Sequence, residues 1–256
     1  MIEVSNLKKE FILSRQQQKE LNTKDKTALA VDSISFRCEP GRVFSLLGPN
    51  GAGKTTTLRM LSTIFKPTSG SIKIAGIDAI AHPQEARKKI GFLTGSTGLY
   101  ARLTPNELIQ YFADLYGVSK TDLAERKERL YTLLDMHEFQ NKRIGKLSTG
   151  MKQKVSICRT MIHDPEVVVF DEPTSGLDVI TAENIITLIR DCKTQGKTVI
   201  FSSHIMSEVD LLCDDMAIIH KGKILFEGTM QDFRSNMQAD NLTAEFIRIV
   251  HASQNA

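Results

Sequence analysis

Long hydrophobic runs are missing from this sequence of 256 residues. A membrane-spanning helix needs roughly 18 or more apolar residues in a row, and no stretch of the chain approaches that length. The N-terminal segment, MIEVSNLKKEF, carries charges where a signal peptide would need its apolar stretch. We therefore expect a protein that stays in the cytosol and does not itself cross a membrane.

Cysteine and net charge are also scarce. The four cysteines lie far apart without a CxxC pair, which argues against disulfides and structural zinc. The 33 Lys and Arg residues against 30 Asp and Glu leave a net charge of +3, so bulk electrostatics gives no case for nucleic acid as a partner. With 41% hydrophobic and 25% charged residues, the composition is that of a folded domain and excludes disorder as the main state.

The sequence does contain alternating strand and helix patterns. Four early segments have strand patterns, and a polar segment at 14–27 indicates a loop or hairpin extension; the strand segments are 2–11, 28–38, 42–48 and 71–77. Helical spacing dominates the middle of the chain, where Thr104 is a predicted N-cap. Strands and helices alternate again from the apolar run at 167–170 onward. This order predicts an α/β fold with a mostly parallel sheet covered by helices.

Residues 48–55, GPNGAGKT, match the phosphate-loop pattern GxxxxGK[ST] and lie between a strand and a helix, as that pattern requires. Glycines let the backbone wrap closely, so that N–H groups point at phosphate oxygens. We expect Lys54 to reach the β- and γ-phosphates of a nucleotide and Thr55 to ligate Mg²⁺. The predicted nucleotide-binding residues here are Gly48, Pro49, Asn50, Gly51, Ala52, Gly53, Lys54, Thr55 and Thr56.

A second acidic element accompanies this loop. The apolar run at 167–170 ends in two carboxylates, Asp171 and Glu172. We expect Asp171 to bind Mg²⁺, mostly through water, and Glu172 to polarise a water that attacks the γ-phosphate.

Three further motifs make the pattern specific. The segment 147–153, LSTGMKQ, resembles the LSGGQ signature of ATP-binding cassette (ABC) ATPases. Residues 175–178, SGLD, resemble the D-loop of that family, and 202–204, SSH, resemble its switch-histidine loop. Together with the phosphate loop and the acidic strand end, five motifs follow the family order over roughly residues 1–230. The chain thus resembles an ABC ATPase over nearly its whole length.

This resemblance implies a P-loop NTPase cassette with a RecA-like core sheet and a small antiparallel β region. The nucleotide-binding domain would span 1–230, with a helical subdomain inserted at about 100–163. Residues 231–256 would form a C-terminal tail to which we assign no role.

The resemblance also implies roles for single residues. Phe11 matches the aromatic that stacks on adenine, although a core position in a strand is an alternative for it. His204 would contact the γ-phosphate, and Ser148 with Gly150 would act in trans on ATP held by another copy. Asp178 would lie at the subunit boundary. ATP and Mg²⁺ are the implied cofactors, and a homodimer that closes over two ATP molecules is the implied assembly.

One position departs from the family pattern. Gly95 stands where the family usually has Gln or Glu, a side chain that reaches Mg²⁺ and the attacking water. Glycine has no side chain for coordination, so either Ser96 or Thr97 substitutes for it, or hydrolysis is slow until a partner binds.

The family resemblance further implies a transport function. Since the sequence contains no span, a transporter needs a separate permease, and this chain would sit peripherally on the cytoplasmic face of the membrane. The signature variant and the segments 57–70 and 205–225 look most like ABC-2-type exporter ATPases, in particular the ATPase of a two-component sodium exporter. Drug, lipid or polysaccharide export, a soluble non-transport ABC ATPase, and a nucleotide-binding regulatory module remain alternatives. A signalling GTPase is disfavoured because no NKxD motif follows the phosphate loop.

Overall fold

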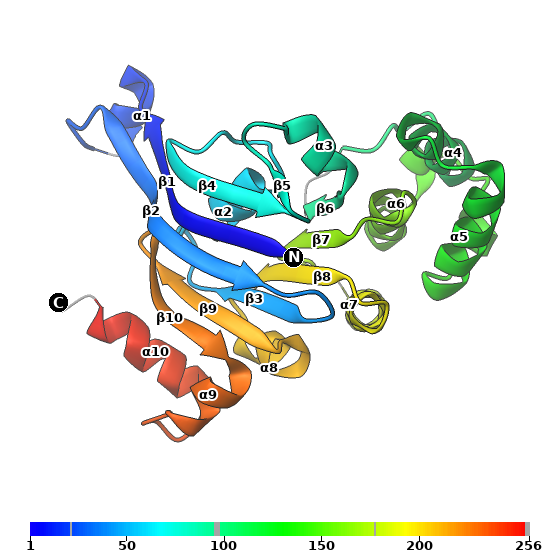
Figure 1. Cartoon of the computed structure of the whole chain (residues 1–256). Coiled ribbons are helices and arrows are strands. Elements are labelled where there is room, and N and C mark those ends of the chain that lie inside the picture. Colours follow the sequence, from blue (N-terminus) through cyan, green and yellow to red (C-terminus); the bar gives the residue numbers. More distant parts are fainter. Residues whose placement is uncertain (21, 95–97, 177, 254–256) are drawn as a thin grey trace.

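The computed structural model describes residues 1–20, 22–94, 98–176 and 178–253, and these form a mixed α/β structure with two sheets (Figure 1). The larger sheet has the strand order β10-β9-β3-β8-β7-β6. Its neighbouring strands are parallel except for the β10–β9 pair. The strands are β3 (Val43–Leu47), β6 (Ile90–Thr94), β7 (Val167–Asp171), β8 (Thr198–Ser203), β9 (Asp215–His220) and β10 (Lys223–Thr229). The prediction of a mostly parallel sheet is confirmed.

Both faces of this sheet are covered, which explains why its central strands are apolar at nearly every position. Along β7, Val167 and Val169 pack into one hydrophobic core, whereas Val168 and Phe170 pack into another. The first core contains α2 (Lys54–Leu61) and the smaller sheet. The second contains α7 (Val179–Thr194) and α8 (Met206–Leu212). A strand buried on both faces needs a continuous apolar run rather than alternation, as the sequence has here.

The smaller sheet is antiparallel and has the order β2-β1-β4-β5. Its strands are β1 (Ile2–Ile12), β2 (Thr27–Cys38), β4 (Ser69–Ile74) and β5 (Ile77–Asp78), and α3 (Pro83–Lys88) follows them. Strands β1 and β2 extend as a hairpin that carries the short helix α1 (Arg15–Glu20) at its tip (Figure 1). This helix buries none of its residues, so the polar sequence at 14–27 contains no apolar periodicity that would predict it.

The middle of the chain is helical. Its elements are α4 (Pro105–Tyr116), α5 (Lys120–Leu133), η1 (His137–Phe139), η2 (Ile144–Lys146) and α6 (Thr149–Met161). Thr104 caps α4 through a reciprocal capping box with Glu107, as the sequence predicts for an N-cap at this position. These helices project to one side of the sheets in Figure 1.

The segment after Thr229, for which the sequence predicts only a tail without an assigned role, forms α9 (Met230–Ser235) and α10 (Leu242–Ala252). Leu242, Phe246 and Val250 lie four residues apart and pack against the second core. The carboxylate of Glu245, 2% exposed, accepts hydrogen bonds from the backbone N–H groups of Gln238 and Ala239. The segment is therefore an ordered helical element that packs against the second core, next to α8 and β10 of the larger sheet.

None of the helices in the described ranges is long and apolar enough to cross a membrane.

Candidate active site

The predicted chemical groups meet where parallel strands end. Strand register pairs Asp171 at the end of β7 with Thr94 of β6 and with Ser202 of β8, and it pairs Leu47 of β3 with Ser203. Because these strands are parallel, the loops that follow them emerge at one edge of the sheet. The phosphate loop, the acidic strand end and the switch-histidine loop are thereby brought together.

The phosphate loop needs glycine at specific positions. A Cβ atom on Gly48 would lie 2.2 Å from the backbone oxygen of Ile219, and one on Gly53 would lie 2.6 Å from that of Ala30. Gly53 also has a φ of 110°, which side chains rarely tolerate. Close packing against β9 and β2 therefore fixes the loop that precedes α2.

Lys54 starts α2 and points its ammonium group back into the loop. The side chain is only 4% exposed, and Nζ donates hydrogen bonds to the carbonyl oxygens of Gly48 (2.7 Å) and Pro49 (3.1 Å). Its Nζ also lies 3.5 Å from Oε1 of Glu172. Burial lowers the pKa of Lys54, while the neighbouring carboxylates of Glu172 and Asp171 oppose that shift. The loop thus contains a buried ammonium group whose hydrogen-bond partners are two backbone carbonyl oxygens.

Two hydroxyl groups hold Asp171. Its Oδ1 accepts hydrogen bonds from Oγ1 of Thr55 (3.0 Å) and from Oγ of Ser202 (2.8 Å). Ser202 also accepts a hydrogen bond from the backbone N–H of Glu172 at 3.0 Å. A single buried serine therefore orients both acidic residues. The sequence motif that contains Ser202 predicts no separate role for it, whereas its place opposite Asp171 in the sheet explains this contact.

Glu172 and His204 face each other. Oε1 of Glu172 lies 3.2 Å from Nδ1 of His204, and both side chains are partly exposed. Glu172 has a φ of 48°, an unusual backbone conformation for a residue other than glycine. Strained backbone at the end of a buried strand is typical of a functional position.

These groups border a cavity of about 480 Å³. Its lining residues are Asn50, Thr55, Arg59, Thr94, Asp171, Glu172 and Ser175. Arg59 and Thr94 are not among the site residues predicted from the sequence motifs. Arg59 lies one helical turn beyond Thr55, and Thr94 ends β6 beside Asp171, so spacing and sheet register are the signals that would find them.

Thr56 and Phe11, the other two residues predicted to bind the nucleotide in the same chain, lie on α2 and on β1. Thr56 is the third residue of α2. Phe11 lies on β1 opposite Ala28 of β2, with its ring edge-on to Phe65 at 5.5 Å between centroids. Its strand neighbour β2 reaches the phosphate loop through the Ala30 contact with Gly53. Phe11 itself does not line the 480 Å³ cavity.

The signature residues form a separate group with the D-loop. Ser148 caps α6 and accepts a hydrogen bond from the backbone N–H of Met151 at 3.2 Å. Asp178 caps α7 by accepting from Thr181, and Gly150 packs against these same two residues. Neither Ser148 nor Gly150 lines the cavity beside Lys54. Within one chain, these signature residues therefore do not line the cavity beside the phosphate loop.

Some predicted positions lie outside the described residues. They are Gly95, Ser96 and Thr97, together with Leu177 of the D-loop.

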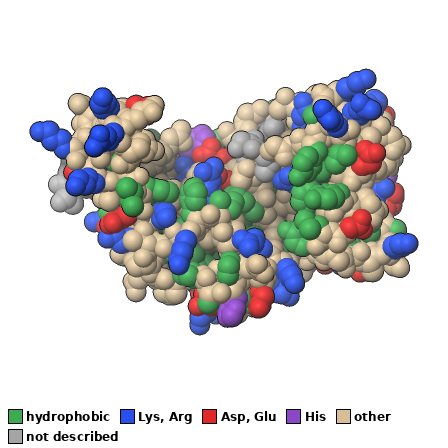
Figure 2. Space-filling view, turned by 90° about the horizontal axis from the view of Figure 1, so that it is seen from above, with side chains coloured by type: hydrophobic (Ala, Val, Ile, Leu, Met, Phe, Trp, Pro, Cys, Tyr) green, Lys and Arg blue, Asp and Glu red, His purple; other side chains and the backbone are tan. Residues whose placement is uncertain are grey.

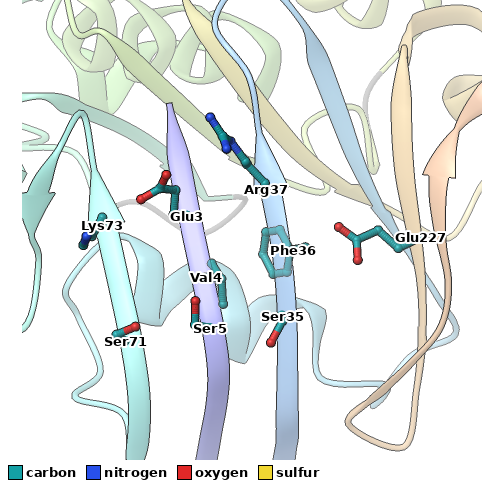
Figure 3. Close-up of a pocket in the computed structure, with 9 residues that line it drawn as sticks. All are labelled: Glu3, Val4, Ser5, Ser35, Phe36, Arg37, Ser71, Lys73 and Glu227. Carbon is teal, nitrogen blue, oxygen red and sulfur yellow. The ribbon is translucent and has the colours of Figure 1, made fainter.

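A second hollow of about 520 Å³ lies elsewhere, on the outer face of the antiparallel sheet (Figure 3). Its lining is mostly polar, with Glu3, Arg37 and Lys73 on three adjacent strands and Glu227 on β10. It shares no residue with the cavity beside the phosphate loop. Alternation with the buried residues Val4 and Phe36 identifies it as the solvent face of amphipathic strands.

Comparisons with known proteins agree with this geometry. Residues 31–175 match the family described as ABC transporter. The ABC transporter ATP-binding protein NatA of Bacillus subtilis is 41% identical over 225 residues, which cover 88% of this chain and 92% of NatA. The bacitracin transport ATP-binding protein BcrA of Bacillus licheniformis is 40% identical over 199 residues, which cover 77% of this chain and 64% of BcrA.

Solved structures have the same fold. A structure of an ATP-binding subunit of an ABC transporter has a TM-score of 0.85 and 25% identity, and covers 97% of this chain and 99% of that one. The dimeric, post-hydrolysis ATP-binding cassette MJ0796, bound to ADP and Pi, has a TM-score of 0.77 and 24% identity over 90% of this chain and 99% of that one. This protein belongs to the ABC transporter family, as a subunit that binds and hydrolyses ATP.

Proposed function

We propose that residues 1–230 form the nucleotide-binding domain, with 100–163 as an inserted helical subdomain, and that ATP phosphates bind at the loop around Lys54. The observation that carries this proposal is the convergence of Lys54, Glu172 and His204, each within 3.5 Å of the next. The carbonyl partners of Lys54 are neutral, so the β- and γ-phosphates would be stronger partners for its ammonium group. Phe11, on β1, would stack on the adenine.

The donor set fits Mg²⁺. Oγ1 of Thr55 and Oδ1 of Asp171 are oxygen donors of the kind that Mg²⁺ prefers; they lie 3.0 Å apart at the edge of the cavity and would hold the ion there. No group of three or more His, Cys, Asp or Glu side chains in the described ranges is arranged to hold a metal, so the ion would depend on phosphate and water oxygens as well. When bound, Mg²⁺ supplies positive charge that stabilises the β- and γ-phosphate oxygens.

Glu172 would accept the proton of the attacking water. Its carboxylate lines the cavity and is oriented through the backbone N–H bond to Ser202. His204 would donate a hydrogen bond to the γ-phosphate through the ring nitrogen that does not face Glu172. Lys54 would stabilise the negative charge that remains on the phosphates.

The test of this site is ATP turnover by purified variants. Lys54→Ala and Glu172→Gln should each lower kcat by roughly 100-fold or more, since each removes a group that acts on the transferred phosphate. Lys73→Ala, on the outer face of the antiparallel sheet, is a matched control and should retain normal turnover. Wild-type turnover in Lys54→Ala would contradict the phosphate-loop assignment.

A second copy of the chain would complete each site. Ser148 is exposed and, like Gly150, does not line the phosphate-loop cavity of its own chain. We infer a head-to-tail dimer in which Ser148 and Gly150 donate hydrogen bonds to the γ-phosphate held by the other copy. Asp178, which packs beside Gly150, would then lie at the boundary between the two chains. MJ0796, which has the same fold, is dimeric.

The helical region offers a surface for a membrane permease. Large apolar side chains are exposed on and beside α4, namely Tyr100, Tyr111, Leu115 and Tyr116. Figure 2 shows hydrophobic side chains gathered over this part of the molecule. A cavity of about 310 Å³ adjoins them and includes Arg87 and Arg159 in its lining. This chemistry fits a cytoplasmic permease segment that has apolar side chains and a carboxylate, which would hold the ATPase on the cytoplasmic face of the membrane.

We propose sodium ions as the cargo. The support is the resemblance of the sequence to NatA, the ATPase of a two-component sodium exporter, together with 41% identity to it. BcrA, named for bacitracin transport, is similar at 40% identity over a shorter length, so an antibiotic is the second candidate.

Transport assays distinguish these cargoes. Vesicles that contain this protein and its permease should move ²²Na⁺ in an ATP-dependent manner, and Glu172→Gln should abolish that movement. Partner-dependent ATP turnover without Na⁺ movement would reject sodium and favour another exported molecule.

A further inference from the structure

Helix α8 carries a carboxylate that contacts both loops of the reactive site. Oε2 of Glu208 accepts a hydrogen bond from Oγ of Ser203 at 2.7 Å. Oε1 of the same side chain accepts a hydrogen bond from Oγ1 of Thr174. One acidic side chain therefore bridges the loop after β7 and the last residue of β8, which directly precedes the switch-histidine turn.

Each of these hydroxyl residues is close in sequence to a reactive group. Ser203 directly precedes His204, and Thr174 follows Glu172 by two residues. Ser203 is 2% exposed and also accepts a hydrogen bond from the backbone N–H of Ile205 at 2.9 Å, so the turn that contains His204 is fixed on both sides. The bridge through Glu208 thus sets how the two loops lie relative to each other.

Helix α8, which carries Glu208, is anchored by its packing against the rest of the protein. Its residues Val209 and Leu212 are buried in the second core, and α10 packs against the helix. Asp210 on its outer side pairs with Arg234 of α9. A carboxylate on an anchored helix can hold the loop after β7 and the turn after β8 in a fixed relative position.

We propose that Glu208 is a positioning residue, which keeps His204 within hydrogen-bond distance of Glu172 through its bonds to Ser203 and Thr174. This inference rests on the proposed roles of Glu172 and His204 in ATP hydrolysis. Glu208 touches neither reactive side chain in the described structure, so it acts through the two loops. An alternative role for an acidic residue in the first turn of a helix is stabilisation of that helix end, which would affect folding but not the catalytic step.

Steady-state ATP turnover by the purified chain separates these roles. Glu208→Ala should lower kcat roughly 10- to 100-fold and leave KM for ATP nearly unchanged, because misplacement of reacting groups affects the chemical step. Glu208→Gln should retain most of the activity, since an amide can accept from one hydroxyl and donate to the other. Asp210→Asn makes the same carboxylate-to-amide change as Glu208→Gln, on the same helix. It is the matched control, with normal kcat expected.

A double-mutant comparison tests the bridge directly. Thr174→Val alone removes one of its two bonds and should lower kcat less than Glu208→Ala does. In the Glu208→Ala background, Thr174→Val should cause no further fall, because the bond is already lost. Should Glu208→Ala fail to fold, Thr174→Val and Ser203→Ala give the same comparison.

Three results would overturn the proposal. The first is a normal kcat per folded Glu208→Ala protein, and the second is an equal fall of kcat in Glu208→Ala and Glu208→Gln. The third is a fall of kcat in the Glu208→Ala, Thr174→Val double variant that equals the product of the falls in the two single variants. Failure of the underlying site assignment has a different signature: His204→Ala and Glu172→Gln would then themselves turn over ATP normally.

Discussion

Removal of the Ser202 hydroxyl should weaken both the fold and the reactive site. This hydroxyl donates to Oδ1 of Asp171 at 2.8 Å and accepts from the backbone N–H of Glu172 at 3.0 Å. In Ser202→Ala, Asp171 keeps its bond from Thr55, but the Glu172 N–H loses its partner.

The size of the effect follows from these two bonds. A hydrogen bond to an ionised group contributes about 1.5–3 kcal/mol, and a buried donor without a partner costs about 1–3 kcal/mol. Since Asp171 retains one hydroxyl partner and the Glu172 N–H is only partly buried, we expect a loss near the lower end of the sum, about 3 kcal/mol in the free energy of unfolding. For a chain of this size that loss lowers the unfolding midpoint by about 6–12 °C.

The chain offers a matched control in Ser45, a fully buried serine on the neighbouring strand β3. Its Oγ has no hydrogen-bond partner among the residues that the structure describes, so Ser45→Ala makes the same change without breaking a bond seen there. That substitution should be neutral or stabilise the fold by about 1 kcal/mol, because an unpaired buried hydroxyl is unfavourable.

Thermal unfolding without nucleotide, followed by circular dichroism, measures both variants. Steady-state turnover should also fall in Ser202→Ala and remain normal in Ser45→Ala. Equal midpoints for the two variants would refute the assigned hydrogen bonds, and normal turnover in Ser202→Ala would refute its role in orienting the acidic residues.

Three further predictions concern other parts of the chain. Gly48→Ala should disturb the phosphate loop, because its Cβ would lie 2.2 Å from the Ile219 backbone oxygen; about 1–3 kcal/mol of stability and most nucleotide affinity should be lost, as thermal unfolding and ATP titration would detect. Burial lowers the pKa of His163 to about 4, so its contribution to stability is full above pH 6.5 and is lost as pH falls toward 4. Urea unfolding between these pH values should show this loss, whereas His163→Gln should lack that component. Asp178→Ala removes the N-cap bonds to Thr181 and should lower the urea midpoint by an amount equivalent to about 1 kcal/mol, while Asp178→Asn should retain most of the cap.

The strands and motifs of the core are evident in the sequence because local chemistry fixes them. The run at 167–170 is apolar on both faces of β7, and Thr104 caps α4 with the side chain that its position predicts. The phosphate loop is likewise local, since its glycines, Lys54 and Thr55 are consecutive or nearly so. In these segments, periodicity and spacing suffice to predict the structure, because the residues that determine it are only a few positions apart in the sequence.

Contacts set by sheet register could not be predicted in this way. Ser202 meets Asp171 because two strands 31 residues apart lie side by side, and no local pattern gives that alignment. Glu208 reaches Thr174 across 34 residues because α8 packs beside the loop that follows β7, which no local pattern gives either. The C-terminal helices illustrate a different limit, because the spacing of Leu242, Phe246 and Val250 fits a helix but their burial depends on tertiary packing.

The most direct test of the central claim is the assembly state of Glu172→Gln with ATP. The proposed site binds ATP in this variant but lacks the carboxylate that accepts the proton of the attacking water. Size-exclusion chromatography with light scattering should show a dimer with MgATP and a monomer without nucleotide, and Ser148→Arg in the same variant should prevent the dimer. A Glu172→Gln protein that binds ATP yet stays monomeric would contradict the account in which two chains close over the nucleotide.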